Sequence, residues 1–292
     1  MQQIHCRLAN PEKICGVVVL YNPERQILDN IASYIGYLDK LFVVDNSEDP
    51  KAELIDALRQ IPNCYYHPFG ENLGIAAALN AGAKLALKEG AGWLLTMDQD
   101  SKFEGDNLKL LIDFTLQQDT GKIGVVSPYH RTKLGVLKRQ EIEEVQSVMT
   151  SGNLVSIPAY VAIDGFDDSL FIDAVDWDFC LRLNMSGFKV LRLNTVFLEH
   201  NLGNASYHKG LSGKEVVVLN YNKIRRYYIT RNKLFIFFKY RKDFPGYCNA
   251  IFKTLFRDLR HIVMYEQHKA SKLRYFFKGI FDFVLGRKGK LL

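Results

Sequence analysis

The chain has 292 residues, 48% of them hydrophobic and 24% charged, which is enough to bury one large core with or without an appendage. No run reaches the roughly 18 uninterrupted apolar residues that a membrane-spanning helix needs. The N-terminal segment MQQIHCRLANPEK has no apolar core of a signal peptide, which argues against export. The five cysteines are scattered, without a C-x-x-C pair, and this favours reduced thiols in the cytoplasm over disulfides or a zinc site.

Strand and helix patterns alternate over the first 100 residues. The continuous apolar run at 14–21 predicts a buried parallel strand. Further strands are expected at 41–44, 64–67 and 93–97, and helices at 26–38, 52–60 and 75–89. This alternation predicts an α/β fold with a parallel sheet covered by helices. Ligands of such sheets bind beyond the carboxyl ends of the strands, where Asp45, Asn72 and Asp98 are expected.

The pattern is less regular after residue 100. Helices are expected at 108–117 and 171–184, strands at 123–127 and 189–198, and two more strands within 141–156. Residues 221–292 hold 18 Lys/Arg against 4 Asp/Glu, whereas residues 1–220 hold 20 against 28. We therefore expect one domain at 1–220, with its regular part at 1–100 and a less regular part at 101–220, and a basic helical extension at 221–292.

Asp98-Gln99-Asp100 follows the strand predicted at 93–97. In extended backbone, residues i and i+2 point the same way, so both carboxylates are expected to face one site. Two such oxygen ligands suit Mg²⁺ or Mn²⁺ shared with a diphosphate. The alternative is a solvated acidic turn, because D-x-D alone is common.

A second acidic cluster, Asp173, Asp176 and Asp178, lies among apolar side chains in LFIDAVDWDFCLRL. Apolar and like-charged neighbours tend to raise the pKa of a carboxyl group, which suits a general base. The alternative is a helix N-terminus stabilised by acidic residues, with Arg182 as the i+4 partner of Asp178. We favour catalysis for Asp176 and a structural or orienting role for Asp178.

Seven segments, in this order and spacing, resemble the family 2 glycosyltransferases with the GT-A fold, and among them the bacterial rhamnosyltransferases. The segments are VVVLYNP (17–23), VVDNS (43–47), NLGIAAALNAG (72–82), TMDQD (96–100), SGNLVSIPAYVAIDGFDDSLFIDAVDWDFCLR (151–182), EHNLG (199–203) and RRYYITRN (225–232). The resemblance covers roughly three quarters of the chain and implies that 1–220 is a catalytic domain, with a nucleotide-sugar half at 1–100 and an acceptor half at 101–220.

The resemblance implies a role for each motif position. Contacts to the nucleotide sugar would come from Tyr21, Asn22, Asp45, Asn72, Gly74 and Asp98, with Asp45 accepting a hydrogen bond from the pyrimidine base. Asp100, with Asp98 and His200, would bind Mg²⁺ or Mn²⁺. Asp176 would be the catalytic base, in a Val-Asp pair where the family more often has Glu-Asp. The acceptor would be oriented by Asp173, Trp177, Asp178 and Arg182.

The activity implied is a single inverting displacement from a nucleotide diphosphate sugar, dTDP-L-rhamnose by resemblance, to a saccharide in cell-surface polysaccharide synthesis. Another hexosyl or galactofuranosyl donor, carried by UDP or GDP, is the alternative within the family. A nucleotidyltransferase would bring a glycine-rich basic loop near the first strand, and VVVLYNPERQ has none. Nucleic acid is not expected as a partner, because the body is acidic and carries no nucleic-acid-binding motif.

The basic extension also holds 17 of the 36 aromatic residues. Two amphipathic faces are expected, one with Phe252, Leu255, Phe256, Leu259 and Val263, the other with Phe276, Phe277, Ile280, Phe281 and Val284. Such helices with basic flanks are typical of an anionic membrane interface, and a lipid-linked acceptor would fit this location. The expected location is therefore the inner face of the cell membrane. A helical cap on the catalytic domain or a homodimer contact is the alternative.

Overall fold

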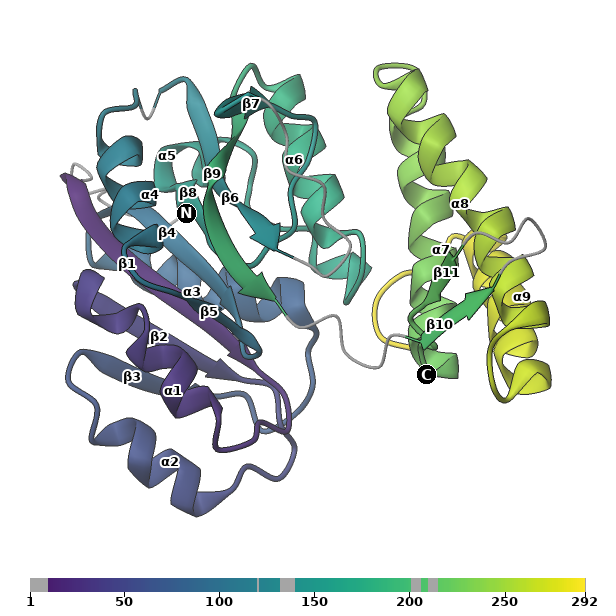
Figure 1. The fold of residues 1–292 in the computed structure, drawn as a ribbon, viewed down its shortest axis with the longest axis horizontal. Coiled ribbons are helices and arrows are strands. Elements are labelled where there is room, and N and C mark those ends of the chain that lie inside the picture. Colours follow the sequence, from purple (N-terminus) through teal and green to yellow (C-terminus); the bar gives the residue numbers. More distant parts are fainter. Residues whose placement is uncertain (1–9, 120, 132–139, 201–205, 210–214, 292) are drawn as a thin grey trace, which may run out of the picture. The chain divides into compact units, whose positions relative to one another are not determined.

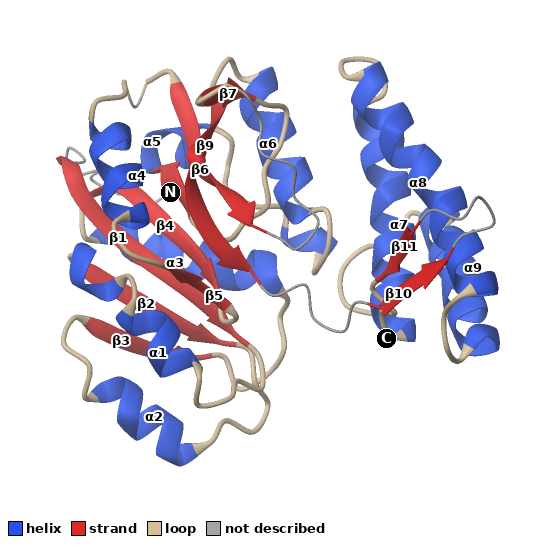
Figure 2. Cartoon of the chain, viewed as in Figure 1, coloured by secondary structure: helices blue, strands red, loops and turns tan. Residues whose placement is uncertain are grey.

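The computed structural model describes residues 10–119, 121–131, 140–200, 206–209 and 215–291 (Figure 1). The chain divides into two compact units. The first comprises Met1–Asp168 and Asp176–Asn201, and the second comprises Ser169–Val175 and Leu202–Leu292. Strands predominate in the first unit and helices in the second (Figure 2).

The first unit is built on a nine-stranded sheet with the order β3-β2-β1-β4-β8-β6-β9-β5, in which β7 also pairs with β9. Its strands are β1 (Asn10–Leu20), β2 (Lys40–Asp45), β3 (Cys64–Pro68), β4 (Ala91–Asp98), β5 (Ser101–Phe103), β6 (Ile123–Arg131), β7 (Ile142–Glu144), β8 (Asn153–Ser156) and β9 (Lys189–His200). The pairs β3–β2, β2–β1, β1–β4 and β6–β9 are parallel, whereas β8 is antiparallel to both β4 and β6. The α/β prediction is confirmed: β1 to β4, in the first 100 residues, pair in parallel, and β6 and β9 form a further parallel pair after them.

Helices cover both faces of the sheet. They are α1 (Ile27–Ala32), α2 (Ala52–Arg59), α3 (Ile75–Lys88), α4 (Asn107–Leu116), α5 (Ile157–Ala162) and α6 (Val175–Met185), with 3-10 turns at Ile35–Tyr37 and Asp168–Leu170. Buried residues of α1, α2 and α4 share a core with Val18 and Leu20 of β1. Val17 points to the other face, where a Cβ on Gly82 of α3 would come within 2.2 Å of it. Glycine at 82 thus lets α3 pack closely on β1.

The helix expected at 171–184 begins four residues later, at Val175. Phe171, Asp173 and Ala174 have φ values of 67°, 63° and 63°, which a right-handed helix cannot contain. That part of the prediction is wrong, and the acidic cluster is divided between an irregular segment and the first turn of α6. The short elements α5 and β5 were not predicted.

The second unit contains a two-stranded antiparallel hairpin, β10 (Ser206–Lys209) and β11 (Glu215–Val218), followed by α7 (Lys223–Tyr240), α8 (Pro245–Met264) and α9 (Lys269–Val284). An apolar cluster of Leu234, Leu255, Ile262 and Phe276 joins the three helices. The helical character of the extension was expected, but the hairpin was not.

Three of the four acidic residues in 221–292 are buried and paired within the second unit. Asp258 contacts Arg226 and Lys233, and Glu266 contacts Arg226 and Lys272. Asp282 pairs with Lys278 at 3.0 Å and Arg287 at 3.3 Å and accepts a hydrogen bond from the Tyr227 hydroxyl. These ion pairs bury part of the positive charge of residues 221–292 inside the unit. Removing one partner of a pair would leave the other charge buried and uncompensated.

The two expected amphipathic faces are divided between the core and the surface. Phe252, Leu255 and Leu259 pack in the apolar cluster, whereas Phe256 is 64% exposed. The apolar side chains exposed on α8 and α9 and just beyond are Phe256, Val263, Met264, Phe277, Phe281, Val284 and Leu285. Within the described part of the chain, no helix is long and apolar enough to cross a membrane.

Candidate active site

The parallel register places three expected site residues at one edge of the sheet. Leu20, which precedes Tyr21, lies opposite Asp45, and Val19 lies opposite Asp98. Because β1, β2 and β4 run in the same direction, their carboxyl ends form a single edge. Tyr21, Asp45 and Asp98 are therefore neighbours at this edge.

Tyr21 is fixed through its backbone by Gln99. The Tyr21 N–H donates to the Gln99 side-chain oxygen at 2.8 Å, and the Gln99 amide donates to the Tyr21 carbonyl at 3.3 Å. The Asn30 side chain donates to the Gln99 carbonyl at 2.8 Å, which also ties α1 to this turn. The Tyr21 residue stays 46% exposed. Gln99 and Asn30 thus hold the strand end in place while the Tyr21 ring is accessible, and neither of them was predicted as a site residue.

Asn22 continues the turn after β1. Its φ of 46° places it in the left-handed region, where asparagine is tolerated better than most residues. Its N–H donates to the Ser47 hydroxyl at 2.7 Å, which joins the ends of β1 and β2.

Asp45 is 2% exposed and both of its carboxylate oxygens accept hydrogen bonds. Oδ1 accepts from the Ser47 N–H at 2.8 Å, and Oδ2 accepts from the Tyr66 hydroxyl at 2.7 Å. Burial and the hydrogen bond to Asp45 raise the pKa of Tyr66, so the phenol stays protonated and donates. Each carboxylate oxygen has a second lone pair, which leaves Asp45 able to accept a further hydrogen bond.

The loop before α3 is organised by two asparagines. The Asn72 side chain accepts from the Gly74 N–H at 3.0 Å. Asn46, which is 3% exposed, accepts from the Leu73 N–H at 3.2 Å and donates to the Gly74 carbonyl at 3.3 Å. Gly74 has φ 90°, a value that favours glycine, and α3 begins directly after it. Asn46 is a loop anchor that the sequence reasoning missed.

Asp98 ends β4, and Gln99 and Asp100 form a turn rather than extended backbone. The alternation argument for Asp98 and Asp100 therefore does not apply, although both acids lie at the same strand end. The Asp98 N–H donates to the Ser151 hydroxyl at 3.0 Å. The Asp100 carboxylate accepts from the Ser101 hydroxyl at 3.5 Å.

His200 is the last residue of β9, and in the register of the sheet it lies opposite Ser101. The strand pairing thus places position 200 one residue from Asp100, but the His200 side chain lies outside the described part of the structure. Among the described residues, no group of three or more His, Cys, Asp or Glu side chains is arranged to hold a metal ion. The donor set at Asp98 and Asp100 fits a cation that takes one or two carboxylates and completes its shell with substrate phosphates, as Mg²⁺ does.

Asp176 and Trp177 lie in the first turn of α6 and are partly exposed. The Asp176 Oδ1 atom accepts the Trp177 N–H at 2.9 Å. Asp176 lines a small cavity together with Thr96 of β4 and Asn153 of β8. Because Thr96 is two residues before Asp98, the first turn of α6 lies close to the strand that ends in the D-x-D sequence.

Asp178 lies in the same first turn of α6, but its side chain is only 1% exposed. It accepts from Arg182 Nε at 2.7 Å, and Arg182 Nη1 donates to the Ile163 carbonyl at 2.6 Å. The pair thus connects α6 to the end of α5. Asp178 and Arg182 therefore stabilise the packing of α6 against the end of α5.

Asp173 belongs to the second unit, with the segment Ser169–Val175. Its carboxylate pairs with Arg225 at 3.3 Å. Burial raises the pKa of Asp173, and the Arg225 guanidinium opposes that shift. The structure therefore joins Asp173 to α7 rather than to the cavity that Asp176 lines.

The amino-acid sequence matches the profile of Glycosyl transferase family 2 over residues 16–174, more than half of the chain. It is 28% identical over 296 residues to the dTDP-rhamnosyl transferase RfbF of Shigella flexneri, an alignment that covers 94% of this chain and 96% of that protein. The predicted resemblance to family 2 rhamnosyltransferases is confirmed.

Solved structures of glycosyltransferases share the fold. TarS 1–349 of S. aureus in complex with UDP-GlcNAc aligns with a TM-score of 0.59 and 14% identity, covering 94% of this chain and 81% of TarS 1–349. GalNAc-T7 with UDP, GalNAc and Mn²⁺ aligns with a TM-score of 0.56 and 13% identity, covering 64% of this chain and 43% of GalNAc-T7. At these identities the likeness shows the fold alone, and the predicted GT-A fold is confirmed.

Proposed function

Because this chain belongs to glycosyl transferase family 2, we propose that it transfers L-rhamnose from dTDP-L-rhamnose to a hydroxyl group of a saccharide acceptor, with inversion at the anomeric carbon. Glycosyl transfer follows from the family, and the likeness to the Shigella flexneri dTDP-rhamnosyl transferase supports this donor. The observation that carries the site is that Asp176 of α6 lies close to β4, the strand that ends in Asp98. Asp98 ends β4, and Asp176 shares a cavity with Thr96 of the same strand.

The donor is proposed to lie along the carboxyl ends of β1, β2 and β4. The nucleotide would contact Tyr21, Asn22, Asp45, Asn72, Gly74 and Asp98. The exposed ring of Tyr21 and the hydrogen-bonded, oriented carboxylate of Asp45 support a base pocket. A fixed carboxylate can accept the ring N–H of a pyrimidine without reorganising.

Asp176 is proposed as the general base. Its carboxylate takes the proton of the acceptor hydroxyl while that oxygen forms a bond to the anomeric carbon. The bond between the anomeric carbon and the diphosphate oxygen breaks, and the electron pair leaves with the nucleotide diphosphate. A single displacement of this kind inverts the anomeric centre. Trp177, Asp173, Asp178 and Arg182 would orient the acceptor or the helix that carries Asp176.

A divalent cation, Mg²⁺ or Mn²⁺, would be held by Asp98 and Asp100 at the end of β4, with His200 of β9 as a third candidate ligand. When bound, such a cation neutralises charge on the departing diphosphate. Through this cation, Asp98 and Asp100 would hold the diphosphate at the sheet edge.

A donor screen with metal removal tests the proposal. We expect dTDP-L-rhamnose with acceptor to release dTDP faster than UDP- or GDP-linked hexoses or galactofuranose do. Chelation of divalent cations should slow this release by at least about a hundredfold, because metal stabilisation of the leaving group supplies several kcal/mol. Preferential turnover of a UDP- or GDP-sugar would assign the donor to the alternative within the family. Release of pyrophosphate from a nucleoside triphosphate would instead indicate a nucleotidyltransferase.

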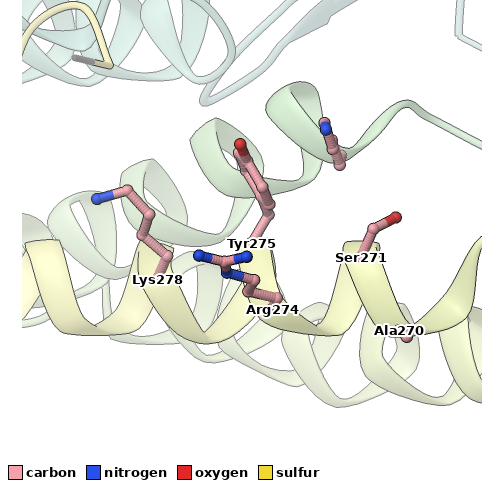
Figure 3. A pocket seen from close by; sticks show the side chains of 6 residues that line it. Ala270, Ser271, Arg274, Tyr275 and Lys278 are labelled. Carbon is pink, nitrogen blue, oxygen red and sulfur yellow. The ribbon is translucent and has the colours of Figure 1, made fainter.

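The second unit supports a lipid-linked acceptor. A cavity of about 460 Å³ is lined by Lys223, Arg274, Tyr275 and Lys278 with Ala270 and Ser271, and the side chains from α9 are shown in Figure 3. Lys278 pairs with Asp282, whereas no salt bridge to a described acidic residue is found for Lys223 or Arg274; the Lys223 amine lies over the Tyr275 ring. Phe277 and Phe281, both more than half exposed, share the face of α9 that carries Arg274 and Lys278.

Cations beside exposed aromatic side chains are the composition that binds an anionic bilayer surface. We therefore propose that α9 contacts the inner face of the cell membrane, where it meets a lipid-linked saccharide. Cys15, Cys64, Cys180 and Cys248 are free thiols, which fits a reducing compartment.

Binding to liposomes tests this contact. The full chain should co-sediment with vesicles that contain anionic lipid. The double variant Phe277→Ser and Arg274→Glu should weaken the binding at least tenfold, because it removes apolar contact and reverses one charge. Leu110→Ser is the matched control, since Leu110 is 53% exposed on α4 of the first unit. Equal binding of all three proteins would reject the membrane contact, and a change in oligomeric state instead would assign this face to a homodimer.

A further inference from the structure

Asn80, a buried residue of α3, makes all four hydrogen bonds that its side-chain amide allows. The residue is 7% exposed. Its Nδ2 atom donates to the Phe166 carbonyl at 2.9 Å and to the Asp168 carboxylate at 2.6 Å. Its Oδ1 atom accepts the Phe166 N–H and the Tyr160 hydroxyl, both at 2.9 Å. An amide has two N–H donors and two acceptor lone pairs, so the orientation of this side chain is fixed.

These hydrogen bonds join α3 to the turn that follows α5. Asp164 and Gly165 in this turn have φ values of 59° and 71°, and the Gly165 N–H donates to the Tyr160 carbonyl at 2.9 Å. A Cβ on Gly165 would come within 2.7 Å of Asn80 Oδ1, so glycine lets the turn pack against the amide. Burial raises the pKa of Tyr160 to about 12, which keeps the phenol protonated and able to donate. Asn80 therefore fixes both backbone polar groups of Phe166, the residue that ends the turn.

The Phe166 ring packs against α6. It stacks on Phe179 with ring centroids 4.1 Å apart and ring planes 20° from parallel, and both residues are buried. Phe179 comes three residues after Asp176, a spacing that places two side chains on one face of a helix. Phe166, Phe179 and Asp176 also line the same small cavity. All of these residues belong to the first unit, so the contacts from Asn80 to this cavity lie within one compact unit.

We infer that Asn80 is a positioning residue for the transfer reaction, because it holds Phe166 as a wall of the cavity that the Asp176 carboxylate lines. The inference rests on the proposed role of Asp176 as the base. A base must lie within hydrogen-bond reach of the proton that it takes, so a displaced wall should lower kcat rather than donor affinity. Since α3 begins directly after Gly74, one helix contacts both the proposed nucleotide loop and this cavity.

Kinetics of Asn80→Asp and Phe166→Leu test the inference. The aspartate has the same shape but cannot donate to the Phe166 carbonyl or to the Asp168 carboxylate. The leucine keeps the backbone hydrogen bonds but loses the ring that stacks on Phe179. We expect each variant to lower kcat at least tenfold, while KM and the dissociation constant of the nucleotide sugar stay within threefold. The two losses in kcat should be less than additive in the double variant, because both act through the same ring.

Two further measurements separate positioning from a loss of stability. Adding Asp168→Asn to Asn80→Asp exchanges donor and acceptor in their hydrogen bond and should raise kcat at least threefold above that of Asn80→Asp. Fluorescence quenching by acrylamide reports on Trp177, which follows Asp176 and is partly exposed, whereas the other tryptophan, Trp93, is 1% exposed. Quenching should increase in Asn80→Asp, because the first turn of α6 loses packing.

Thr115→Val is the control within the same unit, because Thr115 is buried on α4 and its hydroxyl donates to the Leu111 carbonyl. It should lower the melting temperature with kcat and quenching unchanged. If kcat of Asn80→Asp and of Phe166→Leu equals that of Thr115→Val, the inference is overturned. Asp176→Asn is measured in parallel. An active Asp176→Asn would reject the proposed base and with it the positioning of that base, whereas an inactive Asp176→Asn with a normal Asn80→Asp would reject the positioning role alone.

Discussion

Asp176→Asn is expected to lower kcat by about a thousandfold, within the range of 10² to 10⁴ that general base catalysis supplies. The asparagine amide cannot take a proton from the acceptor hydroxyl at neutral pH. Its Oδ1 atom can still accept the Trp177 N–H, the hydrogen bond that the Asp176 carboxylate makes. The substitution should therefore remove the base while leaving the first turn of α6 folded.

The measurements are steady-state transfer of the sugar, the dissociation constant of the donor and the melting temperature. Donor affinity should change less than threefold, because the proposed nucleotide contacts lie on β1, β2, β4 and the loop before α3. Asp164→Asn is a suitable control, since Asp164 lies in the turn after α5 outside the acidic cluster. Wild-type turnover by Asp176→Asn would exclude Asp176 as the base and direct attention to another acid.

The sequence predicted the elements whose patterns are long and regular. The apolar run of β1 and the alanine-rich α3 correspond to elements with bounds within a few residues of those expected. The start of α6 was missed because Phe171, Asp173 and Ala174 carry no glycine or proline signal for their left-handed backbone. That conformation depends on hydrogen bonds to Asn232, some 60 residues away along the chain.

The strand-end acids could be predicted from local pattern alone. Parallel strands share a direction, so Asp45 and Asp98 had to lie at one edge once β2 and β4 were placed. Their partners could not be found in this way, because Tyr66 and Ser151 reach the edge only through tertiary packing.

Asp178→Asn should lower the free energy of unfolding by about 3 kcal/mol, at the lower end of the cost of breaking a buried ion pair by removing one partner. Asp178 is 1% exposed, and the Arg182 side chain that it pairs with is 20% exposed. Without the carboxylate, the guanidinium would keep its charge in a mostly dry position. Urea unfolding monitored by circular dichroism measures this loss as a lower midpoint at constant slope.

The chain offers a control with the same spacing. Lys109 and Asp113 also form an i,i+4 pair, but their side chains are 58% and 51% exposed. Asp113→Asn should therefore cost less than about 1 kcal/mol, as is usual for surface pairs. The double variant Asp178→Leu and Arg182→Met should recover much of the loss, because apolar side chains of similar volume remove both charges.

The results for Asp176→Asn and Asp178→Asn distinguish a catalytic role from a structural role within the acidic cluster. The two residues lie in the first turns of one helix, yet only Asp176 lines the cavity shared with Thr96. We expect Asp176→Asn to be stable and inactive, and Asp178→Asn to be destabilised but to retain turnover well below its melting temperature. A stable and inactive Asp178→Asn would transfer the catalytic role to Asp178, and the Arg182 ion pair would then hold the base rather than the helix.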